Sequence, residues 1–158
     1  MEEVIKKYID ERYPLKVEEY NNTLKNQKEQ KLEKVEDRIF VVDDLMWQDQ
    51  IENQKLKLNR LEFKIYCRNL ELANRKDWRV PKYKELISLV NYKKQNPASI
   101  KKIKFINATK YWSSDTSIIE KNKNWFVDFK YGTSDVANDL EKLHIRCVRE
   151  VSSKKGTY

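Results

Sequence analysis

The chain has few of the residues that form tight turns and phosphate-binding loops. Its 158 residues include two glycines and three prolines. A loop that cradles phosphate through its backbone amides needs several closely spaced glycines, so the sequence excludes nucleotide-binding proteins of that kind. Turns must instead use Asn, Asp and Ser, whose short polar side chains favour turn conformations.

Metal ligands and catalytic nucleophiles are also scarce. His144 is the one histidine, and Cys67 and Cys147 are the two cysteines. A structural zinc site takes four such ligands. A catalytic triad containing His144 is not expected either, because no sequence motif marks a nucleophile. We therefore expect no enzyme activity, no cofactor and no metal. His144 is expected to lie partly exposed on a strand, on the face opposite Cys147.

Long hydrophobic runs are missing as well. No apolar run approaches the roughly 20 residues of a membrane-spanning helix, so we expect no membrane span. The first residues, MEEVIKKYIDERY, lack the apolar stretch of a signal peptide. The protein is expected to be either cytoplasmic or exported with a leader that this sequence does not include.

Charged and aromatic residues, by contrast, are plentiful. They make up 37% and 11% of the chain, the net charge is +8 at pH 7, and the mean hydropathy is −0.90. Aromatic side chains supply the buried area that offsets chain entropy, so at least part of the chain must fold around a core. The positive excess lies after residue 40, because residues 1–40 hold nine basic and ten acidic residues.

Residues 1–38 are predicted to form a helical extension. Apolar residues between Val4 and Ile9 repeat at helical spacing before a Tyr-Pro step breaks the pattern, and a second helix with a thin apolar stripe follows. So thin a stripe indicates a solvated helix packed on the domain, or a weak stalk for homo-oligomers. One domain is expected over residues 39–151, followed by a flexible tail over residues 152–158.

The domain sequence indicates mixed α and β structure. Strands are predicted in RIFVVDDLMWQD, NWFVDFKYG and LHIRCVRE, from their β-branched and aromatic content. Within the second phrase, Trp125, Val127 and Phe129 share one face. The four tryptophans are expected to anchor one core: Trp47, Trp78, Trp112 and Trp125.

Two helices are predicted between the first and last strands. Residues 56–73 carry apolar stripes on two sides, one of which contains Leu61 and Ile65. This helix therefore needs two covers, which we expect to be the central sheet and the N-terminal segment. The second helix, over residues 82–92, is expected to begin at Pro81, since proline favours the first helical position.

Cys67 on the first helix and Cys147 on the last strand both fall on faces assigned to the core. If the helix packs on that strand, the two sulfurs can meet. A disulfide closing a loop of about 80 residues would stabilise the fold by roughly 4 to 5 kcal/mol in the chain-entropy model. Two buried free thiols in a cytosolic protein are the alternative, and the pattern alone leaves both open.

Five phrases, in this order, resemble the Lcl C-terminal domain family, bacterial modules grouped with the C-type lectin-like superfamily: LMWQD, YCRNLELANRKDWRVPKYKELISLV, YWSSD, NWFVDFKYG and IRCVRE. The resemblance covers residues 39–150. It implies an α+β, C-type lectin-like fold in which two helices flank a small, twisted, mostly antiparallel sheet, with a long irregular loop region for ligands. It also implies that Cys67 and Cys147 form a disulfide, and hence that the protein is exported.

The chain departs from the family pattern at three positions. Lys82 replaces a threonine, which removes the hydroxyl half of a capping box with Glu85 and should let the second helix fray slightly. Asn74 replaces a glycine and can still end the first helix in the left-handed region. Asp115 replaces another threonine and adds a carboxylate where the long loop begins.

Calcium is not expected, although it serves sugar-binding members of the superfamily. Those members use a Glu-Pro-Asn or Gln-Pro-Asp triplet and a Trp-Asn-Asp phrase to supply oxygen ligands, and neither occurs here. Asn96-Pro97 has no carboxylate before it, and phenylalanine follows Trp125. Scattered aspartates are usually turn and surface residues, which is what we expect of Asp115, Asp128, Asp135 and Asp139.

Basic residues concentrate between Lys82 and Lys110, where eight lysines accompany a single acidic residue, Glu85. Five of them occur in KKQNPASIKKIK, residues 93–104, which we call the lysine-rich loop: Lys93, Lys94, Lys101, Lys102 and Lys104. Clustered ammonium groups attract polyanions in a salt-dependent way. The alternative is a solvated loop without a ligand.

The lysines and the resemblance together predict a non-enzymatic recognition module of an exported bacterial protein, whether periplasmic, secreted or at the cell surface. We expect this adhesin-like domain to bind an anionic surface polymer such as a sulfated glycan. The alternative is a structural or assembly protein whose helical extension and lectin-like domain contact other proteins. Nucleic acid is not expected, because the lysines beside Tyr92, Tyr111 and Trp112 match no recognised nucleic-acid motif.

Overall fold

The computed structural model describes residue 22 and residues 38–152, and the latter belong to one compact unit. The predicted helical extension and tail therefore lie almost wholly outside the described residues. The elements of residues 38–152 are, in chain order, β1 (Ile39–Val42), β2 (Leu45–Gln48), α3 (Glu52–Lys55), β3 (Lys57–Leu58), α4 (Arg60–Asn69), α5 (Tyr83–Ile87), β4 (Lys110–Thr116), β5 (Lys123–Asp128), β6 (Thr133–Asn138), β7 (Leu143–His144) and β8 (Val148–Glu150).

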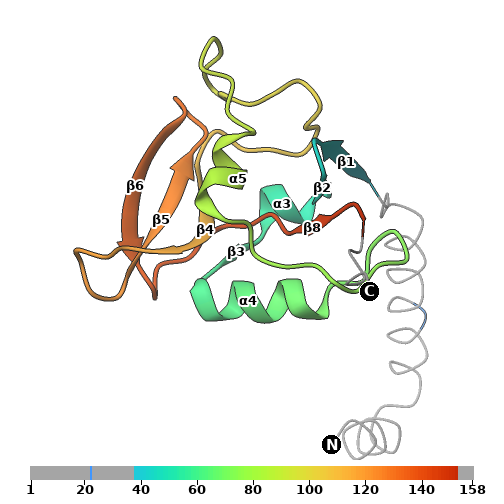
Figure 1. Ribbon diagram of the computed structural model, residues 1–158, viewed down its shortest axis with the longest axis horizontal. Coiled ribbons are helices and arrows are strands. Elements are labelled where there is room, and N and C mark those ends of the chain that lie inside the picture. The colour runs from blue at the N-terminus through green and yellow to red at the C-terminus, as the bar shows by residue number, and fades with distance from the viewer. Residues whose placement is uncertain (1–21, 23–37, 153–158) are drawn as a thin grey trace, which may run out of the picture. The chain divides into compact units, whose positions relative to one another are not determined.

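The strands form two sheets, which Figure 1 shows on opposite sides of the domain. One sheet has the order β1-β2-β8 and the other has the order β3-β7-β4-β5-β6. Neighbouring strands are antiparallel, except that β4 and β7 pair in parallel. The predicted α+β class and mostly antiparallel pairing are confirmed, and the described residues add a second sheet and a third helix to the one sheet and two helices expected.

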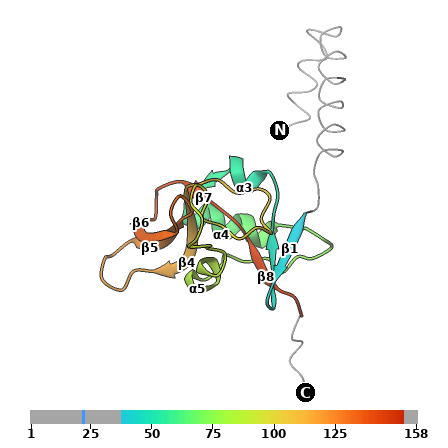
Figure 2. The same ribbon diagram turned by 90° about the horizontal axis from the view of Figure 1, so that it is seen from above.

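The larger sheet has apolar clusters on both faces. Tyr111 of β4 packs in a cluster with Leu86 of α5, whereas the next residue, Trp112, packs in a second cluster with Phe63 of α4. This arrangement follows from the geometry of a strand, in which successive side chains point to opposite faces. Helices α4 and α5 thus cover opposite faces of the same strands, beside which both appear in Figure 2.

The tryptophans anchor two clusters and not one. Trp47 belongs to the cluster around α5, and Trp78 and Trp112 belong to the cluster around α4; all three are buried. Trp125 is exposed, contrary to the prediction, with its ring centroid 5.6 Å from that of Tyr83. Its aromatic neighbour, Tyr83, is the first residue of α5.

The predicted disulfide is confirmed. The sulfurs of Cys67 and Cys147 are bonded, and the Cα atoms lie 5.7 Å apart. Both side chains are fully buried in the cluster around α4. The bond joins α4 to the segment immediately before β8.

Helix α4 is shorter than predicted because it is capped at Asn59. The Asn59 side chain accepts a hydrogen bond from the backbone N–H of Glu62, and the Glu62 carboxylate accepts one from the N–H of Asn59, which is a capping box. The two residues before Asn59 pair with β7 as a strand. Leu61 and Ile65 are exposed, and the cover expected from the N-terminal segment lies outside the described residues.

Helix α5 is also shorter than predicted, since Pro81 precedes it by two residues and it ends at Ile87. Glu85 accepts a hydrogen bond from the backbone N–H of Lys82, at 2.7 Å. A lysine side chain has no acceptor to offer the helix amides. None of the helices in the described part of the chain is long and apolar enough to cross a bilayer.

Two predicted strands are each divided in two. RIFVVDDLMWQD forms the hairpin β1–β2, whose turn contains Asp43 with φ 53°. LHIRCVRE forms β7 and β8, which belong to different sheets, so its central residues link the two sheets. The pair Asp43-Asp44 is a turn signal inside the first phrase, whereas no residue of LHIRCVRE signals a break.

The turns use Asn and Asp, as predicted. Of the five described non-glycine residues with positive φ, four are Asn or Asp, and Ala73 is the fifth. Asn74 does adopt the left-handed conformation, but in a turn beyond α4 and not at the helix end. Gly132 has φ 78°, and a Cβ there would lie 2.6 Å from a methyl carbon of Val90, so the position requires glycine.

Candidate functional site

The lysine-rich loop is attached to the domain along most of its length. Inside it, Ala98 and Ile103 are buried in the domain. The backbone N–H of Ala98 donates to the carbonyl of Phe129, and the N–H of Asn96 donates to the carbonyl of Lys130. The loop therefore presents its lysines from a backbone with fixed partners.

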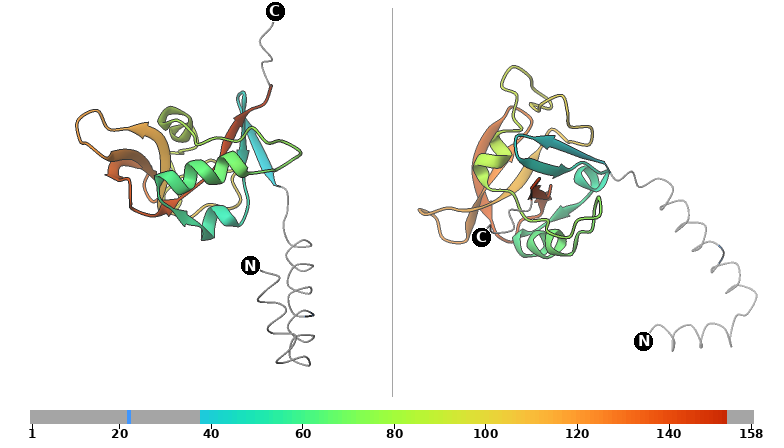
Figure 3. Two further views of the ribbon diagram at one scale, coloured as in Figure 1. Left: turned by 90° about the horizontal axis from the view of Figure 1, so that it is seen from below. Right: turned by 45° about the vertical axis from the view of Figure 1, so that its right-hand side comes forward.

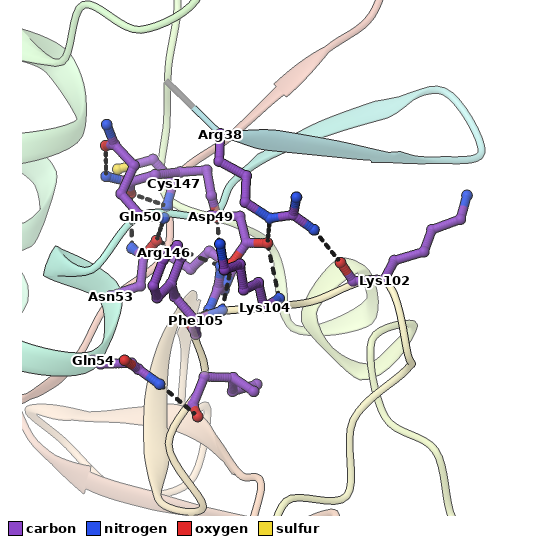
Figure 4. A network of polar contacts seen from close by, with 12 residues as sticks. Arg38, Asp49, Gln50, Asn53, Gln54, Lys102, Lys104, Phe105, Arg146 and Cys147 are labelled. Carbon is purple, nitrogen blue, oxygen red and sulfur yellow. Dashed lines mark hydrogen bonds and ion pairs between the residues drawn. The ribbon is translucent and has the colours of Figure 1, made fainter. Parts of the chain in front are cut away.

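Asp49 holds the end of this loop. Its carboxylate accepts hydrogen bonds from the backbone N–H groups of Lys104 and Phe105, at 2.9 and 2.8 Å. It also accepts one from Nε of Arg38, at 2.8 Å, while the Arg38 guanidinium donates to the carbonyl of Lys102 (Figure 4). A single buried carboxylate thus fixes the position from which Lys104 projects.

Arg146 supports Asp49 from the interior. Its guanidinium is almost fully buried, with Nη1 3.3 Å from Oδ1 of Asp49 and 2.5 Å from the carbonyl oxygen of Gln48. Nη2 donates to the carbonyl of Phe105. Burial lowers the pKa of Arg146 from its ordinary value, while Tyr111 and Asp49 act in the opposite direction. An arginine remains a cation in proteins, so a buried ion pair connects the core to the loop.

The structure brings three of the five predicted lysines around one hollow. Lys94, Lys101 and Lys104 line a hollow of about 630 Å³ whose other walls include Ile100 and Ile106. All three are exposed. The ammonium group of Lys104 lies 5.1 Å from the centroid of the Phe105 ring.

The other two lysines are placed differently. Lys102 is exposed, but its ammonium group donates a hydrogen bond to the carbonyl of Val41 at 3.0 Å, toward the β1–β2 hairpin. Lys93 is exposed and is not among the residues that line the hollow. The predicted set therefore divides into a group of three and two lysines outside it.

His144 is buried, which contradicts the prediction that it lies partly exposed. Its ring packs against that of Tyr111, with centroids 5.4 Å apart, and its Nδ1 has no hydrogen-bond partner. Burial, and then the nearby charge of Lys57, lower its pKa. A neutral, buried imidazole packed on an aromatic ring is a core residue.

The aspartates considered for calcium have local partners. Asp128 and Asp135 each accept a hydrogen bond from a nearby backbone N–H, and Asp139 accepts one from the side chain of Asn124. Asp115 lies on β4. Within the described residues, no three His, Cys, Asp or Glu side chains gather as the ligands of a metal ion.

Sequence reasoning found the lysines but not the ion pair that positions them. Asp49 and Arg146 are separated by 97 positions, and no motif connects them. Their one sequence signal is that each is a charged residue within an otherwise core-forming phrase. A charge is buried only when it is paired or hydrogen-bonded. A charged residue within a core-forming phrase can therefore be expected to have a polar or oppositely charged partner elsewhere in the fold.

A comparison with protein families gives a match. The family model described as the Lcl C-terminal domain matches residues 35–149. No curated protein matches the chain. The matched range includes the disulfide, the lysine-rich loop and both sheets except for Glu150, the last residue of β8.

Proposed function

This chain belongs to the Lcl C-terminal domain family, and from that premise we propose that its domain is a non-enzymatic recognition module with a C-type lectin-like fold, exported from a bacterium. Its ligand is an anionic surface polymer, such as a sulfated glycan, bound at the lysine-rich loop. The disulfide supports export, because disulfides persist in oxidising compartments.

The observation that carries the proposal is the grouping of Lys94, Lys101 and Lys104 around one hollow. Repeated negative charges on a polymer can contact several ammonium groups at once, and the affinity then depends strongly on salt. The anchoring of the loop by Asp49 favours binding further, because side chains on a fixed backbone lose less entropy when a ligand binds.

Retention on immobilised heparin tests the proposal. The variant Lys94→Glu/Lys101→Glu/Lys104→Glu should elute at much lower salt than the wild type. A matched control, Lys55→Glu/Lys84→Glu/Lys121→Glu, changes three exposed lysines outside the hollow by the same net charge. It should lose much less retention. Equal losses in the two variants would mean that net charge alone explains the affinity and that the loop is not the site.

A further inference from the structure

A second hollow, of about 720 Å³, lies on the other side of the larger sheet from α5. Its walls come from α4, from residues 76–80, from the ends of β4 and β5, and from the turn between β6 and β7. Neither the lysine-rich loop nor any residue of the first hollow contributes to it. It is therefore a separate surface of the domain.

The edge of this hollow is unusually apolar for an exposed surface. Leu61 on α4 is 68% exposed and Leu140 in the β6–β7 turn is 79% exposed, and both line it. Thr116, which also lines it, leads into the β4–β5 turn that projects from the domain in Figure 3. That turn carries Ile118 and Ile119, which are 99% and 89% exposed. These four are the most exposed large aliphatic side chains of the described residues, and two of them, Leu61 and Leu140, line the hollow. Exposed apolar surface of this kind marks an interaction site.

Positive charge accompanies the apolar edge. Lys64 and Arg68 lie one turn apart on α4, are exposed, and form no ion pair with any described residue. Arg60 donates hydrogen bonds to the carbonyl oxygens of Ser113 and Ser114. Burial lowers the pKa of Arg60, while the nearby charges of Asp139 and Asp115 act in the opposite direction. Asp139 is the one carboxylate among the lining residues.

We propose that this hollow binds an acidic peptide segment of a partner protein, with a large apolar side chain placed between Leu61 and Leu140 and carboxylates near Lys64 and Arg68. Aliphatic surface gains about 25 cal/mol for each Å² removed from water, a gain that a hydroxyl-covered glycan cannot supply. A second copy of this chain is a poorer occupant, because the chain carries a net charge of +8 and like charges repel.

The experiment measures fluorescence anisotropy of a short fluorescein-labelled peptide in which Asp and Glu alternate with Leu and Phe. Each of two control peptides keeps one of these two features. The first keeps the acidic residues and replaces Leu and Phe by Ser, and the second keeps the apolar residues and replaces Asp and Glu by Asn and Gln. The full-length chain is titrated into each. The acidic apolar peptide should bind at least about tenfold more tightly than either control, a difference of about 1.4 kcal/mol.

Two variants locate the binding. Lys64→Glu/Arg68→Glu removes the charge and Leu61→Ser/Leu140→Ser removes the apolar edge; all four side chains are exposed, so the melting temperature should not change. Each should weaken binding by about tenfold or more. The control variant Lys55→Glu/Lys84→Glu changes two lysines outside the hollow and should leave the affinity for the peptide unchanged.

Several results would overturn the proposal. The acidic apolar peptide fails to bind, or the Ser peptide binds equally well, or the variants of the hollow bind as the wild type does. A heparin oligosaccharide or an anionic vesicle that competes for Lys64 and Arg68 more effectively than the peptide would likewise assign the hollow to another ligand. The loss of heparin retention in Lys94→Glu/Lys101→Glu/Lys104→Glu is measured separately, and it does not depend on whether the peptide binds.

Discussion

The carboxylate of Asp49 and the guanidinium of Arg146 form an ion pair in the interior, with Oδ1 and Nη1 3.3 Å apart and neither side chain more than 1% exposed. Taking two charges out of water is costly, and the pair is maintained because the remaining polar atoms are hydrogen-bonded. Here those bonds run to the backbone of Lys104 and Phe105. The pair therefore links the stability of the core to the position of the lysine-rich loop.

Asp49→Asn should destabilise the domain by about 3 to 5 kcal/mol, because the amide leaves the buried cation of Arg146 without a counter-charge. Urea denaturation measures the free energy of unfolding. Asp43→Asn is the matched control, since Asp43 is exposed in a turn and asparagine tolerates its positive φ. A loss below about 1 kcal/mol in Asp49→Asn would mean that the pair contributes little beyond an ordinary hydrogen bond.

Cys67→Ala/Cys147→Ala should lower the free energy of unfolding by about 4 to 5 kcal/mol, since the bond joins residues 80 positions apart and constrains the unfolded chain. Wild-type protein unfolded with and without a reductant provides the comparison, and the reduced protein should behave much as the double variant does. If the oxidised wild type and the double variant unfold at the same urea concentration, the bond does not stabilise the fold.

Stability should fall as the pH is lowered below about 6.5, the ordinary pKa of histidine. His144 has a lowered pKa in the folded protein, so in this range the unfolded chain binds a proton that the folded chain does not. Its contribution is fully present above the ordinary pKa and is lost on acidification. The carboxyl groups with lowered pKa values, Asp77, Glu85 and Glu150, add a separate loss at lower pH.

The melting temperature between about pH 7.5 and 5.5 measures this effect, with His144→Gln as the variant that cannot titrate. The wild type should lose stability over this interval, and the variant should lose much less. Parallel curves for the two proteins would show that another group titrates.

The sequence predicts the parts of this fold that depend on local pattern. The α+β class, the pairing of Cys67 with Cys147 that the family resemblance implied, and the use of Asn and Asp in turns are all confirmed. The alternation of residues in β5 placed Trp125 on the same face as Val127 and Phe129, which was expected to be buried. Alternation identifies the face of a strand, but it does not show how much of that face other elements bury. Trp125 lies beside Tyr83, the first residue of α5, and stays exposed, so the cover does not extend beyond the start of this helix.

What the sequence could not give depends on contacts between distant segments. The break in LHIRCVRE arises because β7 and β8 pair with different sheets, and no residue in the phrase marks it. The burial of His144 follows from its contact with Tyr111. Likewise, the five lysines form one run in sequence, but only the path of the backbone turns Lys102 toward Val41 and groups three others.

Binding of a heparin oligosaccharide as a function of salt tests most directly whether the lysine-rich loop binds polyanions. Over about 50 to 200 mM salt, the logarithm of the affinity should fall linearly with the logarithm of the salt concentration. In Lys94→Glu/Lys101→Glu/Lys104→Glu the binding should be weaker and the slope shallower, by about 1 for each lysine that contacts a charge. Undetectable binding by the wild type, or the same affinity and slope in both proteins, would contradict the proposed function.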